Sequence, residues 1–90
     1  MANFFENLDP ETADELEQLS RLNYELRENR RALLGAYDAD GDAALLRLIE
    51  DGAVAEHPAY EHFLAARILA ETRETVRALL DERLKEVNRS

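Results

Sequence analysis

Apolar residues recur at helical spacing in two long stretches of this chain. Over residues 10–36, leucines return every three or four residues from Leu16 to Leu33, with one gap. This is the spacing of one face of an α-helix and not the alternation of a strand. Over residues 58–87, a broader apolar stripe runs from Tyr60 to Val87. The pattern therefore predicts an all-α fold with two long helices, and Leu26 and Leu69, one on each stripe, are predicted core residues.

Start and stop signals mark the ends of the predicted helices. Asp9 precedes Pro10, which places a good N-cap before a residue that suits the first helical position. The acidic run over residues 38–42 predicts a turn, after which Asp42 or Asp40 is expected to cap a short helix over residues 43–51.

Gly52 follows the predicted short helix at the position where a left-handed residue ends a helix. Pro58 then opens the last helix, over residues 58–87. Residues 1–90 therefore read as a single helical domain.

The two long helices are too long for a compact domain of this size. They would measure roughly 40 and 45 Å, whereas a compact 90-residue domain has a radius of gyration of only about 12 Å. The lengths predict a hairpin of two long antiparallel helices with a short connecting helix. They also predict a homodimer, in which two hairpins form a core like that of a four-helix bundle.

The charge balance narrows the classes of partner. Twenty acidic and 11 basic residues give a net charge of -9. Such a field repels nucleic acid and anionic membrane surfaces, and it favours a basic or helical protein partner. No apolar run is long enough to span a membrane, and the chain contains no Cys. Both observations favour a cytoplasmic location.

Two clusters of potential ligands do not fit a metal site. Counted from Asp38 as an EF-hand loop, the acidic run has Ala43 and Ile49 where Gly and Glu are required. On a helix, His57 and Glu61 share a face while His62 points away from it. This is fewer than the three or four ligands that zinc prefers. We therefore expect no metal and no cofactor.

Polar residues interrupt both apolar stripes near their middle. If the helices run antiparallel, Asn23 comes level with about Glu71 and Thr72, and Arg30 comes level with the segment that ends at Arg67. Buried polar groups must be paired, so such a layer would fix the register of a bundle. The alternative is a small anion pocket lined by Arg27, Arg30 and Arg67. The candidate site residues are Asn23, Arg27, Arg30, Arg67, Glu71 and Thr72.

The long–short–long order of predicted helices resembles that of the all-helical chorismate mutases. The resemblance covers the helix order of most of the chain and no sequence motif. It implies an intertwined dimer with a basic pocket of several Arg and a Lys for a dicarboxylate. The sole lysine, Lys85, lies near the C-terminus, and the residues after the first long stretch are acidic. No catalytic residue can therefore be carried over to this chain.

An apolar cluster precedes the first cap. Phe4, Phe5 and Leu8 are expected either to fold back on the bundle or to form an arm that docks into a partner molecule. Together these features favour a small acidic helical module for protein–protein interaction, acting as an adaptor, chaperone or regulator without enzymatic activity. The alternative is a small-molecule enzyme or binder with a chorismate-mutase-like pocket.

Overall fold

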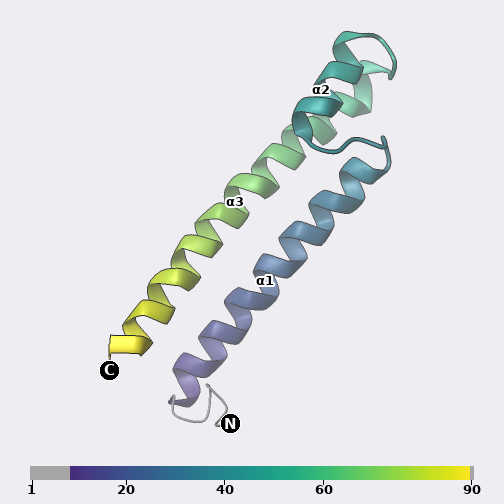
Figure 1. Ribbon diagram of the computed structural model, residues 1–90. Helices are drawn as coiled ribbons and strands as arrows, with labels where there is room; N and C mark the ends of the chain where they lie inside the picture. The colour runs from purple at the N-terminus through teal and green to yellow at the C-terminus, as the bar shows by residue number, and fades with distance from the viewer. Residues whose placement is uncertain (1–8, 90) are drawn as a thin grey trace.

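The computed structural model describes residues 9–89 of the chain. It contains three helices, α1 (Pro10–Gly35), α2 (Asp42–Glu50) and α3 (Glu56–Arg89). The long helices α1 and α3 lie side by side and antiparallel, and the short α2 packs against α3 at one end (Figure 1). Residues 9–89 include no strand. The prediction of an all-helical chain with two long helices packed together is confirmed.

The molecule is a rod. Its principal extents are 55 × 20 × 19 Å, and its radius of gyration is 17.7 Å. A compact chain of this length would have a radius of gyration of about 12 Å. The elongated shape expected from the helix lengths is therefore present. Pro10 and Arg89, the outer ends of α1 and α3, lie at the end of the rod remote from α2 (Figure 1).

Several helix ends follow the local signals in the sequence. The Asp9 carboxylate accepts a hydrogen bond from the backbone N–H of Thr12 at 2.9 Å, which confirms it as the N-cap of α1. Gly52 has a φ of 74° directly after the last turn of α2, which confirms the left-handed stop. His57 is extended, so the regular part of α3 begins at Pro58.

The prediction that Asp42 or Asp40 caps the short helix is wrong. Gly41 occupies the N-cap position of α2 and makes no side-chain capping bond. Asp42 is instead the first residue of the helix, and its carboxylate binds Arg30 of α1. The Asp42 carboxylate therefore links α1 to α2 and does not cap α2.

The hydrophobic core is concentrated at the end of the rod that carries α2. Its buried centre brings together one residue of α1, Leu34, one of α2, Leu45, and three of α3, namely Ala59, Phe63 and Ala66. Leu45 is fully buried. The short helix is amphipathic, and its apolar face covers the first turns of α3.

Packing is thinner along the rest of the hairpin. Leu26 and Leu69, predicted as core residues, are only half-buried. The short helix α2 does not extend over this part of the rod (Figure 1). Three residues of the predicted docking arm, Phe4, Phe5 and Leu8, lie outside the described residues.

Candidate functional site

A polar pair joins the two long helices near the middle of the rod. Arg73 of α3 donates from Nε to the side-chain oxygen of Asn23 on α1 at 3.2 Å. Both residues are half-buried, and both lie on the stripes through which the helices pack. Asn23 was expected opposite Glu71 and Thr72, and the observed partner lies one residue further along α3.

Arg30 links all three helices. From α1, its Nε donates to the backbone carbonyl of Ala66 on α3 at 3.3 Å, and its Nη2 lies 2.5 Å from the Asp42 carboxylate at the start of α2. The side chains of Arg30 and Asp42 are 29% and 31% exposed, so the ion pair is screened only in part by water. This guanidinium is therefore held in place and already supplied with acceptors.

Three of the candidate residues lie on the outer surface of α3. Arg67, Glu71 and Thr72 are all exposed. Arg67 lies 3.8 Å from Glu71 in the ion pair and places its guanidinium over the Phe63 ring at 5.9 Å. The structure thus brings Asn23 and Arg30 into the α1–α3 interface but does not bring Arg67, Glu71 and Thr72 to it.

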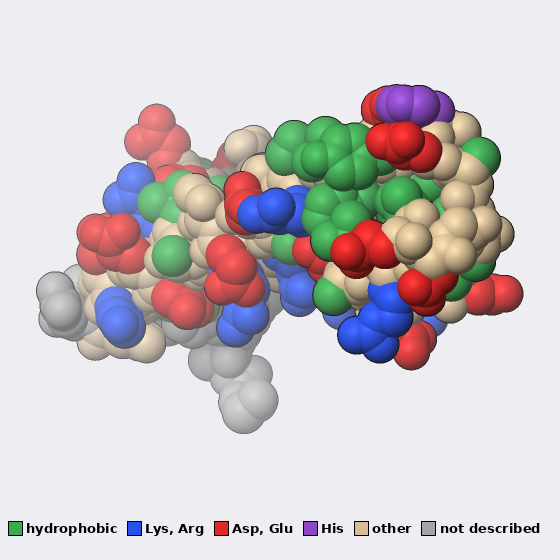
Figure 2. Space-filling model, turned by 90° about the horizontal axis from the view of Figure 1, so that it is seen from above, with side chains coloured by type: hydrophobic (Ala, Val, Ile, Leu, Met, Phe, Trp, Pro, Cys, Tyr) green, Lys and Arg blue, Asp and Glu red, His purple; other side chains and the backbone are tan. Residues whose placement is uncertain are grey.

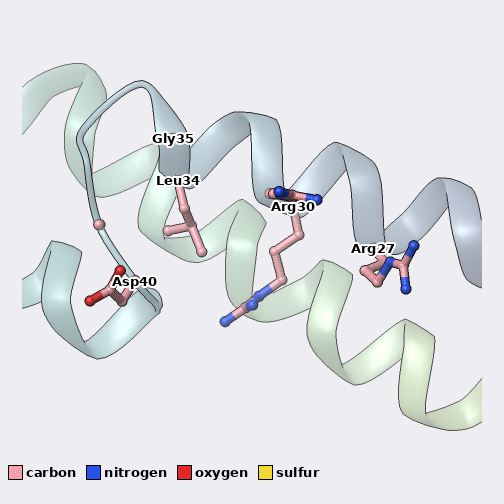
Figure 3. Close-up of a pocket in the computed structure, with 7 residues that line it drawn as sticks. Arg27, Arg30, Leu34, Gly35 and Asp40 are labelled. Carbon is pink, nitrogen blue, oxygen red and sulfur yellow. The ribbon is translucent and has the colours of Figure 1, made fainter.

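Arginines of α1 line an open hollow of about 380 Å³ at the end of that helix (Figure 3). Arg30 extends from α1 toward the neighbouring helix, and Arg27 lies one turn earlier (Figure 3). Asp40 borders the hollow from the following turn. Its lining residues are Arg27, Arg30, Arg31, Leu34, Gly35, Ala39 and Asp40.

The chemistry of this hollow is mixed. Arg27 lies over the ring of Tyr24 at 5.3 Å, and Arg31 meets Glu28 only at 3.8 Å, so both guanidinium groups remain open to an anion. Asp40 and the negative C-terminal end of α1 disfavour the binding of an anion in the hollow. Among residues 9–89, no three His, Cys, Asp or Glu side chains are grouped as a metal ion would require.

The two histidines serve different contacts. His57 lies 2.6 Å from the Glu61 carboxylate on the surface, and this hydrogen bond holds the pKa of Glu61 below its ordinary value. His62 points toward the turn that follows α1, where its Nδ1 lies 2.5 Å from the hydroxyl of Tyr37. The expectation that His62 turns away from His57 and Glu61 is therefore confirmed.

Large hydrophobic side chains remain exposed along the outside of α3. Tyr60, Leu64 and Ile68 are 40%, 40% and 61% exposed and follow one another at four-residue intervals. We call these three residues the outer ridge. Hydrophobic side chains also gather visibly at the α2 end of the molecule, beside a histidine and several acidic groups (Figure 2).

Arg73 and Asp42 were missed as partners of the polar layer. A signal for Arg73 was available, because Ala59, Ala66, Arg73 and Leu80 are spaced by seven residues and so share one side of α3. No local pattern distinguishes Asp42 as a partner of Arg30, since an aspartate after a turn also suits a helix cap.

The comparisons with known proteins give a family and no activity. The family model described as "Uncharacterized protein MJ0235 family" matches residues 13–88, and the chain belongs to that family. The matched range contains nearly all of α1, α2 and α3. No curated protein and no solved structure matches the chain. Within residues 9–89, no helix combines the length and the apolar character needed to cross a membrane.

Proposed function

We propose that this member of the MJ0235 family is a small acidic module for protein–protein interaction, an adaptor, chaperone or regulator without enzymatic activity. The outer ridge carries the proposal. Tyr60, Leu64 and Ile68 form a continuous apolar row on a helix whose other face is already packed. Exposed apolar rows of this kind mark surfaces that bind other proteins.

The outer ridge faces away from α1. At 100° per residue, Leu64 points about 180° from Arg73, which binds Asn23 of α1. Leu64 is thus on the side of α3 opposite α1, and all three ridge side chains remain exposed. Side chains at four-residue spacing form the ridges that pack into the grooves of another helix.

The charge around the outer ridge favours a partner helix with a basic polar face. Exposed Glu61 and Glu71 border the ridge, and Arg67, the cation beside it, is engaged by Glu71 and by the Phe63 ring. The whole chain carries a net charge of -9, which attracts basic surfaces over a longer range. The absence of Cys suits action in the cytoplasm.

Binding of a defined probe tests this function. A synthetic amphipathic helix of leucine and lysine should bind the intact chain in fluorescence anisotropy, and its leucine–glutamate counterpart should not. Replacing Leu64 and Ile68 by Gln should weaken binding about tenfold or more, because apolar contacts at the centre of an interface are lost without any change in charge.

The matched control replaces Tyr24 by Gln. Tyr24 is 54% exposed on α1, away from the outer ridge. This variant should bind the leucine–lysine helix like the unmodified chain. Equal binding by the ridge variant and the control would show that attraction is only electrostatic, and the proposed surface would be wrong. If the ridge variant binds more weakly than the control, photo-crosslinking from position 68 in a native lysate would identify the physiological partner.

A second candidate function is a small-molecule binder or enzyme with a chorismate-mutase-like pocket. The hollow lined by Arg27, Arg30 and Arg31 is the observation that favours it. Arg30 is already occupied by Asp42 and Ala66, which leaves two exposed guanidinium groups for a ligand. A thermal-shift screen with aromatic dicarboxylates tests this candidate, and a shift abolished by Arg27→Gln and Arg31→Gln would support it.

A further inference from the structure

Two contacts of α3, one with α1 and one with the turn that follows α1, define one side of the hairpin. Arg83 of α3 lies 2.8 Å from the Glu15 carboxylate of α1. Toward the opposite end, His62 of α3 lies 2.5 Å from the Tyr37 hydroxyl. Because His62 and Arg83 are 21 residues apart, close to six full turns, they lie on the same side of α3.

Leu69 and Val76 lie on that side, between the two contacts. His62, Leu69, Val76 and Arg83 are separated by steps of seven residues, which is nearly two helical turns. Leu79 follows Val76 after three residues and extends the same side toward solvent.

The facing part of α1 has the same character. Leu22 lies seven residues after Glu15, and Leu26 lies four residues after Leu22. Both therefore project toward the side that carries the Glu15–Arg83 pair. We call the resulting set the apolar flank; it consists of Leu22, Leu26, Leu69, Val76 and Leu79.

The apolar flank is incompletely covered. Leu22 is 41% and Leu79 is 38% exposed, whereas Val76 between them is 7% exposed. Leu26 and Leu69 are half-buried. The five side chains are aliphatic and carry no charge, and together they span both long helices, with exposed Thr72 as a polar neighbour of Leu79 on the same side of α3. The core cluster with α2 lies nearer the other end of the hairpin.

We infer that the apolar flank is the contact surface for a second copy of this chain. The exposed surface of the chain is 6664 Å², against about 5,400 Å² for a compact monomer of 10.3 kDa. The excess is roughly 1,300 Å², and a stable pair buries about 800 Å² on each partner. Pairing of two copies would therefore remove most of the excess.

The apolar flank spans two helices, so it fits another two-helix layer better than a single peptide. In a symmetric pair, the same flank of each hairpin meets its counterpart. Leu26 and Leu69 then complete their burial, and the four long helices enclose one core. In the single chain these two leucines are only half-buried, and the second copy would cover the part that remains exposed.

The negative charge of the chain does not prevent this contact. Six acidic residues precede the first basic residue, Arg21, and they lie in and before the first turns of α1. The five residues of the apolar flank carry no charge themselves, and the Glu15–Arg83 ion pair at its border is neutral overall. Charges separated by more than about 8 Å are largely screened at physiological salt.

This inference is independent of the proposed function, because the two surfaces occupy different parts of α3. Ile68 and Leu79 point within about 20° of each other but are 11 residues apart, roughly 16 Å along the helix axis, and Leu64 points about 140° away from Leu69. A pair formed through the apolar flank would leave both copies of the outer ridge open to a partner. The two surfaces can therefore be tested against each other.

Sedimentation equilibrium of two double variants separates the surfaces. Replacing Leu22 and Leu79 by Gln should raise the dissociation constant of the pair about a hundredfold or more, since each substitution counts twice in a symmetric contact. Replacing Leu64 and Ile68 by Gln, the variant used for the outer ridge, should leave the dissociation constant unchanged. Both variants should keep the helical content of the unmodified chain by circular dichroism.

A milder pair of substitutions keeps the test decisive if the polar variant fails to fold. Leu22→Ala with Leu79→Ala trims the contact without adding polar atoms and should weaken the pair about tenfold. The melting temperature of the unmodified chain should also rise with protein concentration, as mass action requires of a pair.

Three results would overturn the inference. One is a monomer at all concentrations with a melting temperature that does not change. A second is a pair broken by the ridge variant and not by the flank variant. The third is a monomer that loses stability when residues 1–8 are removed, which would assign the apolar flank to that segment of the same chain.

Discussion

The two ends of the rod are built differently although the same two helices run through both. At the α2 end, Leu34, Leu45 and Phe63 belong to a core made from three helices. Along the rest of the hairpin, only Leu16 and Val76 are buried among the described residues. A helix pair shields one stripe on each member, and a third element increases the number of side chains that are enclosed.

The difference shows where stability and binding capacity reside. At the α2 end, the chain itself buries most of the apolar side chains, apart from those of the outer ridge. The bare part of the hairpin carries leucines such as Leu22 and Leu26 that remain open to another molecule. We expect the α2 end to determine whether the chain folds and the bare part to determine how it associates.

The largest expected effect separates Leu45 from Leu26. Leu45→Ala should lower the free energy of unfolding by about 2–5 kcal/mol, because the side chain is 0% exposed and leaves a cavity. Leu26→Ala should cost about 1–2 kcal/mol at low protein concentration. Urea melts measure both, and the loss for Leu26→Ala should grow at high concentration if a second copy completes its burial. Equal losses at low concentration would contradict the contrast between the two ends.

The tie between α1 and α2 should have the next largest effect. Asp42→Asn removes the charge that faces Arg30 and should lower the free energy of unfolding by about 1–2 kcal/mol, since a hydrogen-bonded charge loses its partner. Asp40→Asn, on the exposed turn, is the matched control and should change stability by less than about 0.5 kcal/mol. The same loss for both variants would mean that general charge reduction is responsible.

The polar pair of the bare hairpin should control register more than stability. Asn23→Leu should keep or raise the melting temperature because an apolar residue fits the stripe, and half-buried Arg73 can turn its guanidinium toward water. It should also produce mixed oligomers in light scattering, since a lone polar group in a helical interface selects one pairing. A sharp loss of stability would show instead that the Asn23–Arg73 hydrogen bond anchors the helices.

The smallest expected effect concerns the first turn of α1. The backbone N–H of Thr12 donates to Asp9 and lowers the pKa of that carboxyl. A lowered folded-state pKa means that the cap stabilises the helix above the ordinary carboxyl pKa and is lost as the pH falls through the folded value. The protection of the Thr12 amide, its exchange rate relative to the intrinsic rate at the same pH, should therefore fall at acid pH, and Asp9→Ala should remove that dependence. An unchanged pH dependence in the variant would assign it to another group.

The predictable part of this structure follows from local rules. Asp9 and Gly52 act on backbone groups within a few residues of themselves, so their roles can be read from sequence. The long helices and the rod follow from the spacing of leucines. The core position of Leu26 was overestimated because helical spacing identifies the inner face of a helix but not how many neighbours will cover it.

The less predictable part depends on contacts between distant segments. Arg30 and Asp42 are 12 residues apart and meet only because the turn between α1 and α2 brings them together. To predict Arg73 as the partner of Asn23, the register of the two long helices would have to be known to within one residue. The anion pocket proposed around Arg67 assumed that this residue faced α1, whereas it lies on the outer surface.

The placement of the outer ends of α1 and α3 at the same end of the rod also sets how the molecule responds to force (Figure 1). Tension applied through Pro10 and Arg89 would act across the two helices and not along them. The two long helices would separate first at the end remote from α2, and the separation would advance turn by turn toward α2. The three-helix core around Leu45 would bear the load last, so a pulled molecule would shed its association surface before it lost its folded centre.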